Sequence, residues 1–310
     1  MPSRRDIAAA ADTVSASIRE TPVVTLEADD LALSGEPVSL KLEQLQHTGS
    51  FKPRGAFNRA LTVGEPPAGL IAASGGNHGL AVAHVARSRR VHAEIFVPET
   101  VPPIKLSAIR QLGAEVTLAG PTYDDARQAC EARAAETGAL LIHAYDQPDV
   151  MAGAGTVGLE FEKQVPDLDT LLVAVGGGGL IGGMAAWYGP DVRVVGVEPE
   201  GCPTMAAALA AGEPVAVQVG GLAVDSLGAR ELGTHAFASI SKHGVEAVLV
   251  AEAAIRDAQA LLWDRLRIVA EPGGATALAA LAAGAYVAQP GERVGVVICG
   301  ANTDPSTIRR

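Results

Sequence analysis

The chain has 310 residues, of which 48% are hydrophobic and 19% charged; this composition is typical of a globular protein, and the length suffices for two domains. No apolar run is long enough to cross a bilayer, and the formal net charge of −11 comes without a basic stripe, so we expect neither a membrane nor a nucleic-acid partner. The three cysteines are far apart and form no CxxC pair, which argues against a disulfide framework and a structural zinc site: Cys130, Cys202 and Cys299.

The N-terminal residues MPSRRDIAAAADTV contain two arginines followed by an aspartate, and no uninterrupted apolar segment leads from them to a cleavage site. This pattern is typical of the start of a helix rather than of a secretory signal peptide. We therefore expect a cytoplasmic protein.

Short apolar runs alternate with stretches of helical spacing along almost the whole chain. Nine runs are expected to form strands, at 38–42, 70–73, 93–97, 115–118, 140–143, 171–175, 193–198, 247–250 and 294–299. Helical spacing lies between them, for example at 81–88, 123–136 and 251–266. Strands that are apolar on both faces are typical of parallel sheets covered by helices. The motifs below fall into two groups, so we expect an α/β protein with two open, mostly parallel sheets and a cleft between two lobes.

A lysine lies between glycines in the segment TGSFKPRGA, residues 48–56. Ser50 is a candidate N-cap, which would place Lys52 and Pro53 in a first helical turn, where proline is tolerated. The positive end of the helix dipole disfavours protonation of an amine there, and imine formation with an aldehyde requires a lysine with a lowered pKa. A lone lysine would be interpreted as a solvated surface residue; the flanking glycines and the next motifs favour a reactive one.

The segment SGGNHG, residues 74–79, follows the strand expected at 70–73. A glycine turn between a strand and a helix exposes backbone N–H groups that suit a carboxylate. Asn77 can donate its side-chain amide to a phenolate or carboxylate oxygen. The alternative is an ordinary turn in which Asn77 caps the helix.

Four consecutive glycines follow the strand expected at 171–175: Gly176, Gly177, Gly178 and Gly179. Their N–H groups can surround a phosphate, although the GxxxxGK[ST] spacing of a P-loop is absent. A dinucleotide-binding fingerprint is the rival interpretation, because the glycines up to Gly182 fit GxGxxG and Glu198 follows about twenty residues later. That interpretation leaves two glycines unexplained, so we favour a phosphate site.

The segment CGANTD, residues 299–304, ends the last expected strand. A small side chain at the carboxyl end of a strand points into the crevice where α/β proteins bind ligands. Cys299 is therefore a candidate ligand-facing residue, and the alternative is a small buried hydrophobe.

Taken together, SFKPRGA, SGGNHG, GGGGL and CGAN occur in the order found in fold-type II pyridoxal-phosphate enzymes, the tryptophan synthase β-like group. The chain most resembles their serine/threonine dehydratase (threonine ammonia-lyase) and serine racemase branch, from about Ile7 to about Asp304. The resemblance implies a homodimer with a large lobe, residues 1–64 and 146–310, and a small mobile lobe, residues 65–145. A helix after Pro148 would return the chain to the large lobe.

The resemblance also implies a role for each motif toward pyridoxal 5'-phosphate and a small amino-acid substrate. Lys52 would hold the cofactor covalently and later act as the acid and base at the substrate α-carbon. The other cofactor contacts would be Phe51 at the pyridine ring, Asn77 at the phenolic oxygen, Cys299 at the pyridine nitrogen, and Gly176, Gly177, Gly178, Gly179 and the Leu180 amide at the phosphate. The substrate carboxylate would bind Ser74 and the backbone of Gly75, Gly76, Asn77 and His78.

The implied activity is the PLP-dependent β-elimination of L-serine or L-threonine to a 2-oxo acid and ammonia. Gly75 stands where racemases carry a serine that protonates the opposite face of the α-carbon, which favours a dehydratase over a serine racemase. Glu198 matches the racemase divalent-metal site, but Thr204 stands where an aspartate is expected, so we expect no metal. The alternatives are a racemase, a dehydratase of another 3-hydroxy amino acid and, in a different class, a non-catalytic metabolite-binding protein.

Overall fold

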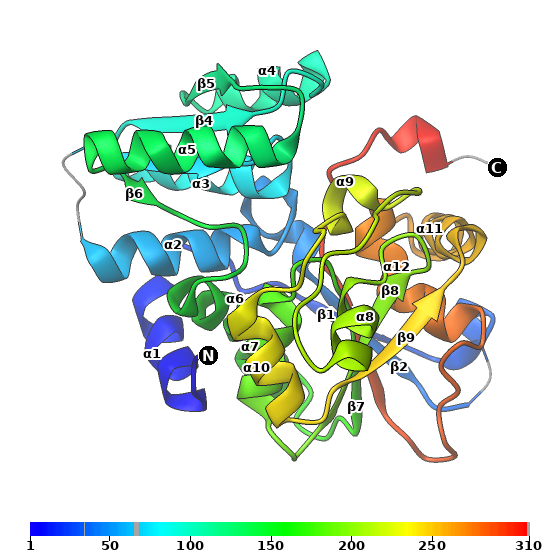
Figure 1. Ribbon diagram of the computed structural model, residues 1–310. Helices are drawn as coiled ribbons and strands as arrows, with labels where there is room; N and C mark the ends of the chain where they lie inside the picture. Colours follow the sequence, from blue (N-terminus) through cyan, green and yellow to red (C-terminus); the bar gives the residue numbers. More distant parts are fainter. Residues whose placement is uncertain (34, 65–67, 309–310) are drawn as a thin grey trace.

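The computed structural model describes residues 1–33, 35–64 and 68–308 and contains two separate sheets (Figure 1). The larger sheet has the strand order β1 (Val23–Leu26), β2 (Val38–Leu42), β10 (Val294–Ile298), β7 (Thr170–Ala174), β8 (Arg193–Pro199) and β9 (Glu246–Val250). The smaller has the order β5 (Glu115–Leu118), β4 (Ala93–Val97), β3 (Leu70–Ala73) and β6 (Leu140–Leu141). Neighbouring strands run parallel except β1 and β2. The expected α/β class is confirmed.

All nine expected strands are present, four of them with ends shifted by one residue, and two larger differences from the prediction stand out. The prediction missed β1, because this edge strand has four residues that are only partly buried or exposed and therefore shows little apolar patterning. It also extended β6 too far. The chain leaves the sheet at 143, where the His143 N–H donates to the side chain of Gln147 (3.0 Å).

Helices connect the strands. They are α1 (Arg4–Val14), α2 (Lys52–Val63), α3 (Asn77–Arg89), α4 (Pro103–Gln111), α5 (Tyr123–Thr137), α6 (Pro148–Gln164), α7 (Gly179–Tyr188), α8 (Thr204–Ala211), α9 (Val224–Leu227), α10 (Thr234–Lys242), α11 (Glu252–Leu266) and α12 (Pro272–Ala282). Short 3₁₀ helices lie at Ala28–Leu31, Glu43–Leu45, His47–Gly49 and Pro305–Ile308. Within the described ranges, no helix combines the length and the apolar character needed to span a membrane.

The N-terminal segment forms helix α1, as expected. Ser3 and Asp6 make a reciprocal capping box: the Ser3 Oγ accepts from the Asp6 N–H (3.3 Å), and the Asp6 carboxylate accepts from the Ser3 N–H (2.8 Å). The helix buries Ile7, Ala10 and Val14, and it packs against α6 and α2.

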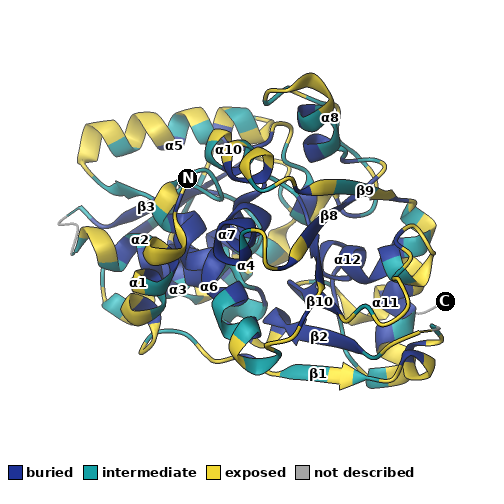
Figure 2. Cartoon of the chain, turned by 90° about the horizontal axis from the view of Figure 1, so that it is seen from below, coloured by how far each residue is buried: buried dark blue, intermediate teal, exposed yellow. Residues whose placement is uncertain are grey.

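The small sheet is covered on both faces because alternate strand residues point to opposite sides. Ile71 and Phe96 pack with residues of α5, whereas Ala72 and Ile95 pack with residues of α3 and α4. In the large sheet, α12 packs across β7, β8, β9 and β10, and α7 packs on β7 and β8. Figure 2 shows β2, β10, α7 and α12 as buried and the edge strand β1 as more exposed.

Helix α6 lies between α7 and α2, and a buried ion-pair network fixes it there. Arg54 on α2 is fully buried and donates to both oxygens of Glu43 (2.8 and 2.7 Å) and both oxygens of Glu160 on α6 (3.1 and 2.9 Å). The buried Lys41 on β2 also binds Glu160 (2.6 Å). Two cations and two carboxylates therefore join the start of α2 to the large sheet.

Candidate active site

The carboxyl ends of the strands of the two sheets meet at one place. Asn77 follows β3 in the small sheet, and its side chain bonds to Glu271 at the start of α12 (2.6 Å) and to Asn302 beyond β10 (2.6 Å). Ser50 forms an antiparallel bridge with Gly300, again after β10. The structure therefore brings three of the four sequence motifs together, at the edge where open α/β sheets bind ligands.

Lys52 is the first residue of α2, and its Nζ donates to the Ala144 carbonyl (2.8 Å). Burial lowers the pKa of Lys52 to about 8, against the opposing effects of Cys299 and Glu271. The prediction that Ser50 caps this helix was wrong: Phe51 is at the N-cap position, and Ser50 is extended in its bridge to Gly300. Burial, rather than the helix dipole alone, therefore makes the amine less basic.

Phe51 lies next to this amine. Its ring centroid is 5.0 Å from the Lys52 Nζ, and its backbone N–H donates to the Cys299 carbonyl (3.2 Å). Cys299 is buried, its Sγ is 3.5 Å from the Gly273 carbonyl, and burial raises the pKa of the thiol to about 12. Cys299 therefore stays protonated beside Lys52 at neutral pH.

The SGGNHG segment forms the start of α3. Gly76 is the N-cap residue and contributes no side-chain cap, so the alternative in which Asn77 caps the helix is wrong. The Leu80 N–H makes the bond back to the Gly76 carbonyl (3.1 Å), so the amides of residues 77–79 precede the helical ladder and can bind an anion. The Ser74 Oγ accepts from the Gly76 N–H (3.2 Å).

His78 belongs to this segment, but its ring lies in the interior. The ring Nε2 is 2.8 Å from the Ile142 carbonyl, which can only accept a hydrogen bond, so Nε2 carries the hydrogen. Burial lowers the pKa of His78 to about 3, with Lys52 acting in the same direction. The imidazole is therefore neutral, and only the backbone of His78 is available for an anion.

The four glycines form the turn from β7 into α7. Gly178 has a φ of 88°, which favours glycine, and it is the N-cap without a side-chain bond. A Cβ atom at Gly177 would overlap the ring of Tyr145. The first helical bond runs from the Gly182 N–H to the Gly178 carbonyl (2.8 Å), so earlier amides, including that of Leu180, remain for a phosphate.

The dinucleotide interpretation of these glycines has no support from Glu198. This carboxylate is fully buried and accepts from the amides of Met205 (2.6 Å) and Ala206 (2.9 Å) at the start of α8, where a ribose has no access. Thr204 uses its hydroxyl on the Ala229 carbonyl (2.7 Å). In the described part of the chain, no group of three or more His, Cys, Asp or Glu side chains is placed to hold a metal ion.

Glu198 makes the stability of the protein depend on pH. Burial raises its pKa to about 7 from 4.5, although backbone amides oppose this. The folded protein therefore binds this proton more tightly than the unfolded chain, and the stabilisation is complete below pH 4.5 and lost as the pH rises through 7. We expect the free energy of unfolding to fall about 3 kcal/mol more between pH 4.5 and 7.5 in the wild type than in Glu198→Gln. Urea titrations at both pH values measure this difference, and equal changes in the two proteins would contradict the assignment.

Sequence reasoning assigned no role to Glu271. Its carboxyl is buried in the site, it accepts from Asn77, and burial raises its pKa to about 7. Glu271 is the N-cap residue of α12, directly before Pro272, but it is not a preferred capping residue and its side chain makes no cap bond, so the rules for helix starts gave no signal for it. Tyr145, whose ring covers the glycine turn, carried no sequence signal.

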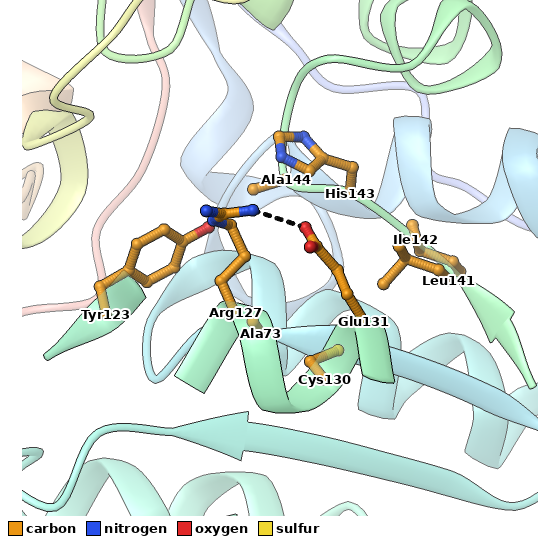
Figure 3. Close-up of a pocket in the computed structure, with 9 residues that line it drawn as sticks. All are labelled: Ala73, Tyr123, Arg127, Cys130, Glu131, Leu141, Ile142, His143 and Ala144. Carbon is orange, nitrogen blue, oxygen red and sulfur yellow. Dashed lines mark hydrogen bonds and ion pairs between the residues drawn. The ribbon is translucent and has the colours of Figure 1, made fainter. Parts of the chain in front are cut away.

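A small cavity flanks the site on the side of α5 (Figure 3). Its lining includes Ala144, the residue whose carbonyl accepts from Lys52, together with His143. Arg127 lies between Tyr123 and Glu131 and donates to Glu131 (2.7 Å). The α5 helix therefore supplies polar side chains to a cavity that borders Ala144, the residue to which Lys52 donates.

Two exposed ion pairs connect the helices of the small sheet to the segment around α9. Lys105 on α4 is 2.9 Å from Asp225, and Asp124 on α5 is 3.7 Å from Arg230. Exposed pairs of this kind contribute little stability. The Asp225 carbonyl oxygen would lie 3.7 Å from a Cβ atom at Gly76, so α9 borders the SGGNHG turn.

Known proteins resemble this chain over nearly its whole length. A family model described as "Pyridoxal-phosphate dependent enzyme" matches residues 14–300. The L-threonine ammonia-lyase of Thermotoga maritima is 38% identical over 283 residues, covering 90% of this chain and 70% of the relative. The phenylserine dehydratase of Ralstonia pickettii is 35% identical, covering 94% and 91%.

A solved structure extends the likeness to three dimensions. The serine racemase of Dictyostelium discoideum superposes with a TM-score of 0.91 at 34% identity, covering 98% of this chain and 99% of the other. The resemblance deduced from the four motifs is thereby confirmed, together with the fold type. The chain belongs to the family of pyridoxal-phosphate-dependent enzymes.

Proposed function

We propose that the enzyme acts on L-serine and L-threonine as a dehydratase (ammonia-lyase), releasing a 2-oxo acid and ammonia. The observation that carries this proposal is Lys52, a half-buried amine whose pKa is lowered to about 8 and which lies where the ends of the two sheets meet. The names of the relatives, L-threonine ammonia-lyase and phenylserine dehydratase, support elimination as the reaction class.

The residues of the site suit the cofactor. Pyridoxal 5'-phosphate, when bound, supplies the electron sink for electrons released at the α-carbon. We assign Lys52 to its aldehyde, Phe51 to its ring, Asn77 to its phenolic oxygen, Cys299 to its pyridine nitrogen, and Gly176, Gly177, Gly178, Gly179 and the Leu180 amide to its phosphate. The free amides at the start of α7 support the phosphate assignment.

The side chains of the chain itself then direct the reaction. Lys52, with its lowered pKa, takes the α-proton as a neutral amine. Ser74 and the backbone of residues 75–78, at the start of α3, hold the substrate carboxylate. The raised pKa of Cys299 keeps its proton on the sulfur near neutral pH. Cys299 would therefore not protonate the pyridine nitrogen of the bound cofactor, and an unprotonated pyridine nitrogen favours elimination over transamination.

The assay of 2-oxo acid release from L-serine, L-threonine and larger 3-hydroxy amino acids tests the proposal, with D-serine followed by chiral chromatography. Pyruvate or 2-oxobutanoate without D-serine is the expected result. D-serine in comparable amounts would make the enzyme a racemase instead. A coloured protein that converts none of these substrates would overturn the substrate assignment and leave the family unchanged.

The space around Gly75 supports a dehydratase rather than a racemase. A Cβ atom at residue 75 would lie 2.8 Å from the Val101 Cγ2, so Val101 fills the position that a side chain would need. Gly75→Ser alone is therefore expected to raise the KM for L-serine roughly tenfold, because the turn must shift, and to form no D-serine.

Combining Gly75→Ser with Val101→Ala is expected to restore the KM and to place a hydroxyl over the site, so that D-serine forms. Val101→Ala alone is the matched control and should form none. If Gly75→Ser by itself keeps the wild-type KM, Val101 does not restrict this position.

Three further properties belong to the proposal. A homodimer follows from the family resemblance, and gel filtration with light scattering tests it. A small lobe of residues 65–145 that moves against the rest is supported by the separate small sheet. A cytoplasmic location belongs to the same proposal, and cell fractionation tests it.

A further inference from the structure

The side-chain amide of Asn77 is held from both sides. Its Nδ2 donates to the Glu271 Oε1 (2.6 Å), and its Oδ1 accepts from the Asn302 Nδ2 (2.6 Å). The same Asn302 nitrogen donates to the Thr48 carbonyl (2.7 Å). Four residues from distant parts of the chain thus form one continuous row of hydrogen bonds.

The direction of this row is fixed at its backbone end. The Thr48 carbonyl can only accept, so the Asn302 atom facing it must be the amide nitrogen. The second hydrogen of that nitrogen then requires an acceptor, which is the Asn77 Oδ1. The nitrogen of Asn77 must consequently face Glu271, which accepts. In the opposite orientation, the Asn77 oxygen would face the Glu271 carboxylate oxygen, and the Asn77 nitrogen would face the Asn302 nitrogen.

The turn before Lys52 is shaped around Asn302. Thr48 and Gly49 both have positive φ values, 59° and 76°. A Cβ atom at Gly49 would lie 2.8 Å from the Asn302 Oδ1, so only glycine leaves room for this side chain. The Ala301 N–H also donates to the Gly49 carbonyl (2.9 Å). A strained turn of this kind persists because the surrounding contacts hold it.

One hydrogen of Asn77 remains for a ligand. Among the residues that the structure describes, Nδ2 donates to Glu271 alone, and an amide nitrogen has two hydrogens. The amide lies near the segment that carries Lys52: the Asn77 Nδ2 would be 3.3 Å from a Cβ atom at Gly300, and Gly300 pairs with Ser50, two residues before Lys52. Glu271 is buried, and it holds the other hydrogen of this nitrogen.

We infer that Asn302 and Glu271 are positioning residues, which orient the Asn77 amide so that its free N–H faces the phenolic oxygen of the cofactor. The inference rests on the proposed function, because that function places the cofactor on Lys52. Neither residue need touch the cofactor. Asn302 donates to the Asn77 oxygen and thereby fixes which way the amide faces, and Glu271 accepts from the Asn77 nitrogen.

Asn302→Asp reverses the row. Aspartate donates nothing at neutral pH, so Asn77 must turn its nitrogen toward residue 302 and present its oxygen to the cofactor. We expect the dissociation constant of the cofactor to rise about ten- to a hundredfold, as for a lost hydrogen bond to a charged group. We also expect the visible absorption band of the lysine-bound cofactor to change at a higher pH, because a donor that favoured the phenolate is gone.

Asn58→Asp is the matched control. Asn58 likewise donates to a backbone carbonyl, that of Asp149 (2.7 Å), but it is buried in the middle of α2, whereas Asn302 is exposed. It should lose thermal stability as Asn302→Asp does and leave both cofactor measurements at their wild-type values. If the two variants change the cofactor measurements equally, or if neither changes them, the inference is wrong.

The double variant Asn302→Asp with Glu271→Gln separates positioning from stability. The amide introduced by Glu271→Gln can donate to the Asn77 oxygen, so both bonds of Asn77 form again in the reversed direction, while the Thr48 carbonyl stays without its donor at residue 302. We expect the thermal stability to recover relative to Asn302→Asp while the weak cofactor binding persists. Recovery of cofactor binding along with stability would show a purely structural role. If Asn302→Asp does not fold, Asn302→Ala carries the same expectation with a smaller effect.

The wild-type protein distinguishes the two possible failures. A purified wild type without a visible band, or with a band that survives Lys52→Ala, contradicts the proposed function itself. A wild type whose band depends on Lys52, combined with an unchanged Asn302→Asp, contradicts only the positioning role.

Discussion

Replacing Lys52 with alanine is expected to abolish the visible colour of the purified protein and to lower 2-oxo acid release by at least roughly 10⁴-fold, because one amine both attaches the cofactor and moves the α-proton. Lys52→Arg should be equally inactive, since a guanidinium stays protonated. The absorption spectrum and the initial rate with L-threonine measure both effects.

The loss should be specific to chemistry and leave the fold intact. Burial lowers the pKa of Lys52, which means that the folded protein holds this ammonium at a cost, so removing it should not lower the free energy of unfolding. Lys242→Ala changes an exposed lysine at the end of α10 and should retain colour and rate. A coloured, active Lys52→Ala protein would move the cofactor to another residue.

Replacing Arg54 with methionine is expected to lower the free energy of unfolding by about 3–5 kcal/mol. Methionine fills much of the same volume, but Glu43 and Glu160 are left with Lys41 as their only cation in the network. Burial alone would raise the pKa of Glu160, and Arg54 with Lys41 instead lowers it, so the carboxylate depends on these partners. Urea unfolding at neutral pH measures the loss.

Two further variants interpret that loss. Arg193→Met removes the exposed pair with Glu246 (2.6 Å) and should cost less than about 1 kcal/mol. Adding Glu43→Gln to Arg54→Met removes one unpaired charge and should recover part of the stability. If Arg54→Met is no more harmful than Arg193→Met, the buried network does not stabilise the fold.

The sequence was informative where the residues of one short segment determine its structure or its ligand. Four glycines after a buried strand predict an anion-binding turn, and Lys52 was recognisable because glycines and Asn77 accompany it in a familiar order. The strands were predictable for the same reason, since an apolar run of four or five residues between helical stretches is a local pattern. The cofactor and the reaction class followed from these motifs.

The rest depended on contacts that no local pattern contains. The bridge between Ser50 and Gly300 turned an apparent helix cap into extended backbone, and it joins residues 250 positions apart. Glu271 became a site residue only because the fold places it against Asn77. Val101, which follows β4, leaves no room for a side chain at Gly75, which follows β3. Such pairings are tertiary, and periodicity within a segment cannot show them.

The way in which the site is assembled also bears on how the protein folds. Its residues come from both ends of the chain, and the contact from Thr48 to Asn302 closes one of the longest loops possible here. Contacts of such sequence separation form slowly, after local structure. The cofactor-binding geometry should therefore be among the last features to appear during refolding. A ligand that binds only the folded state stabilises that state by mass action. The rate at which the yellow colour returns during refolding would therefore measure the rate of the last folding step.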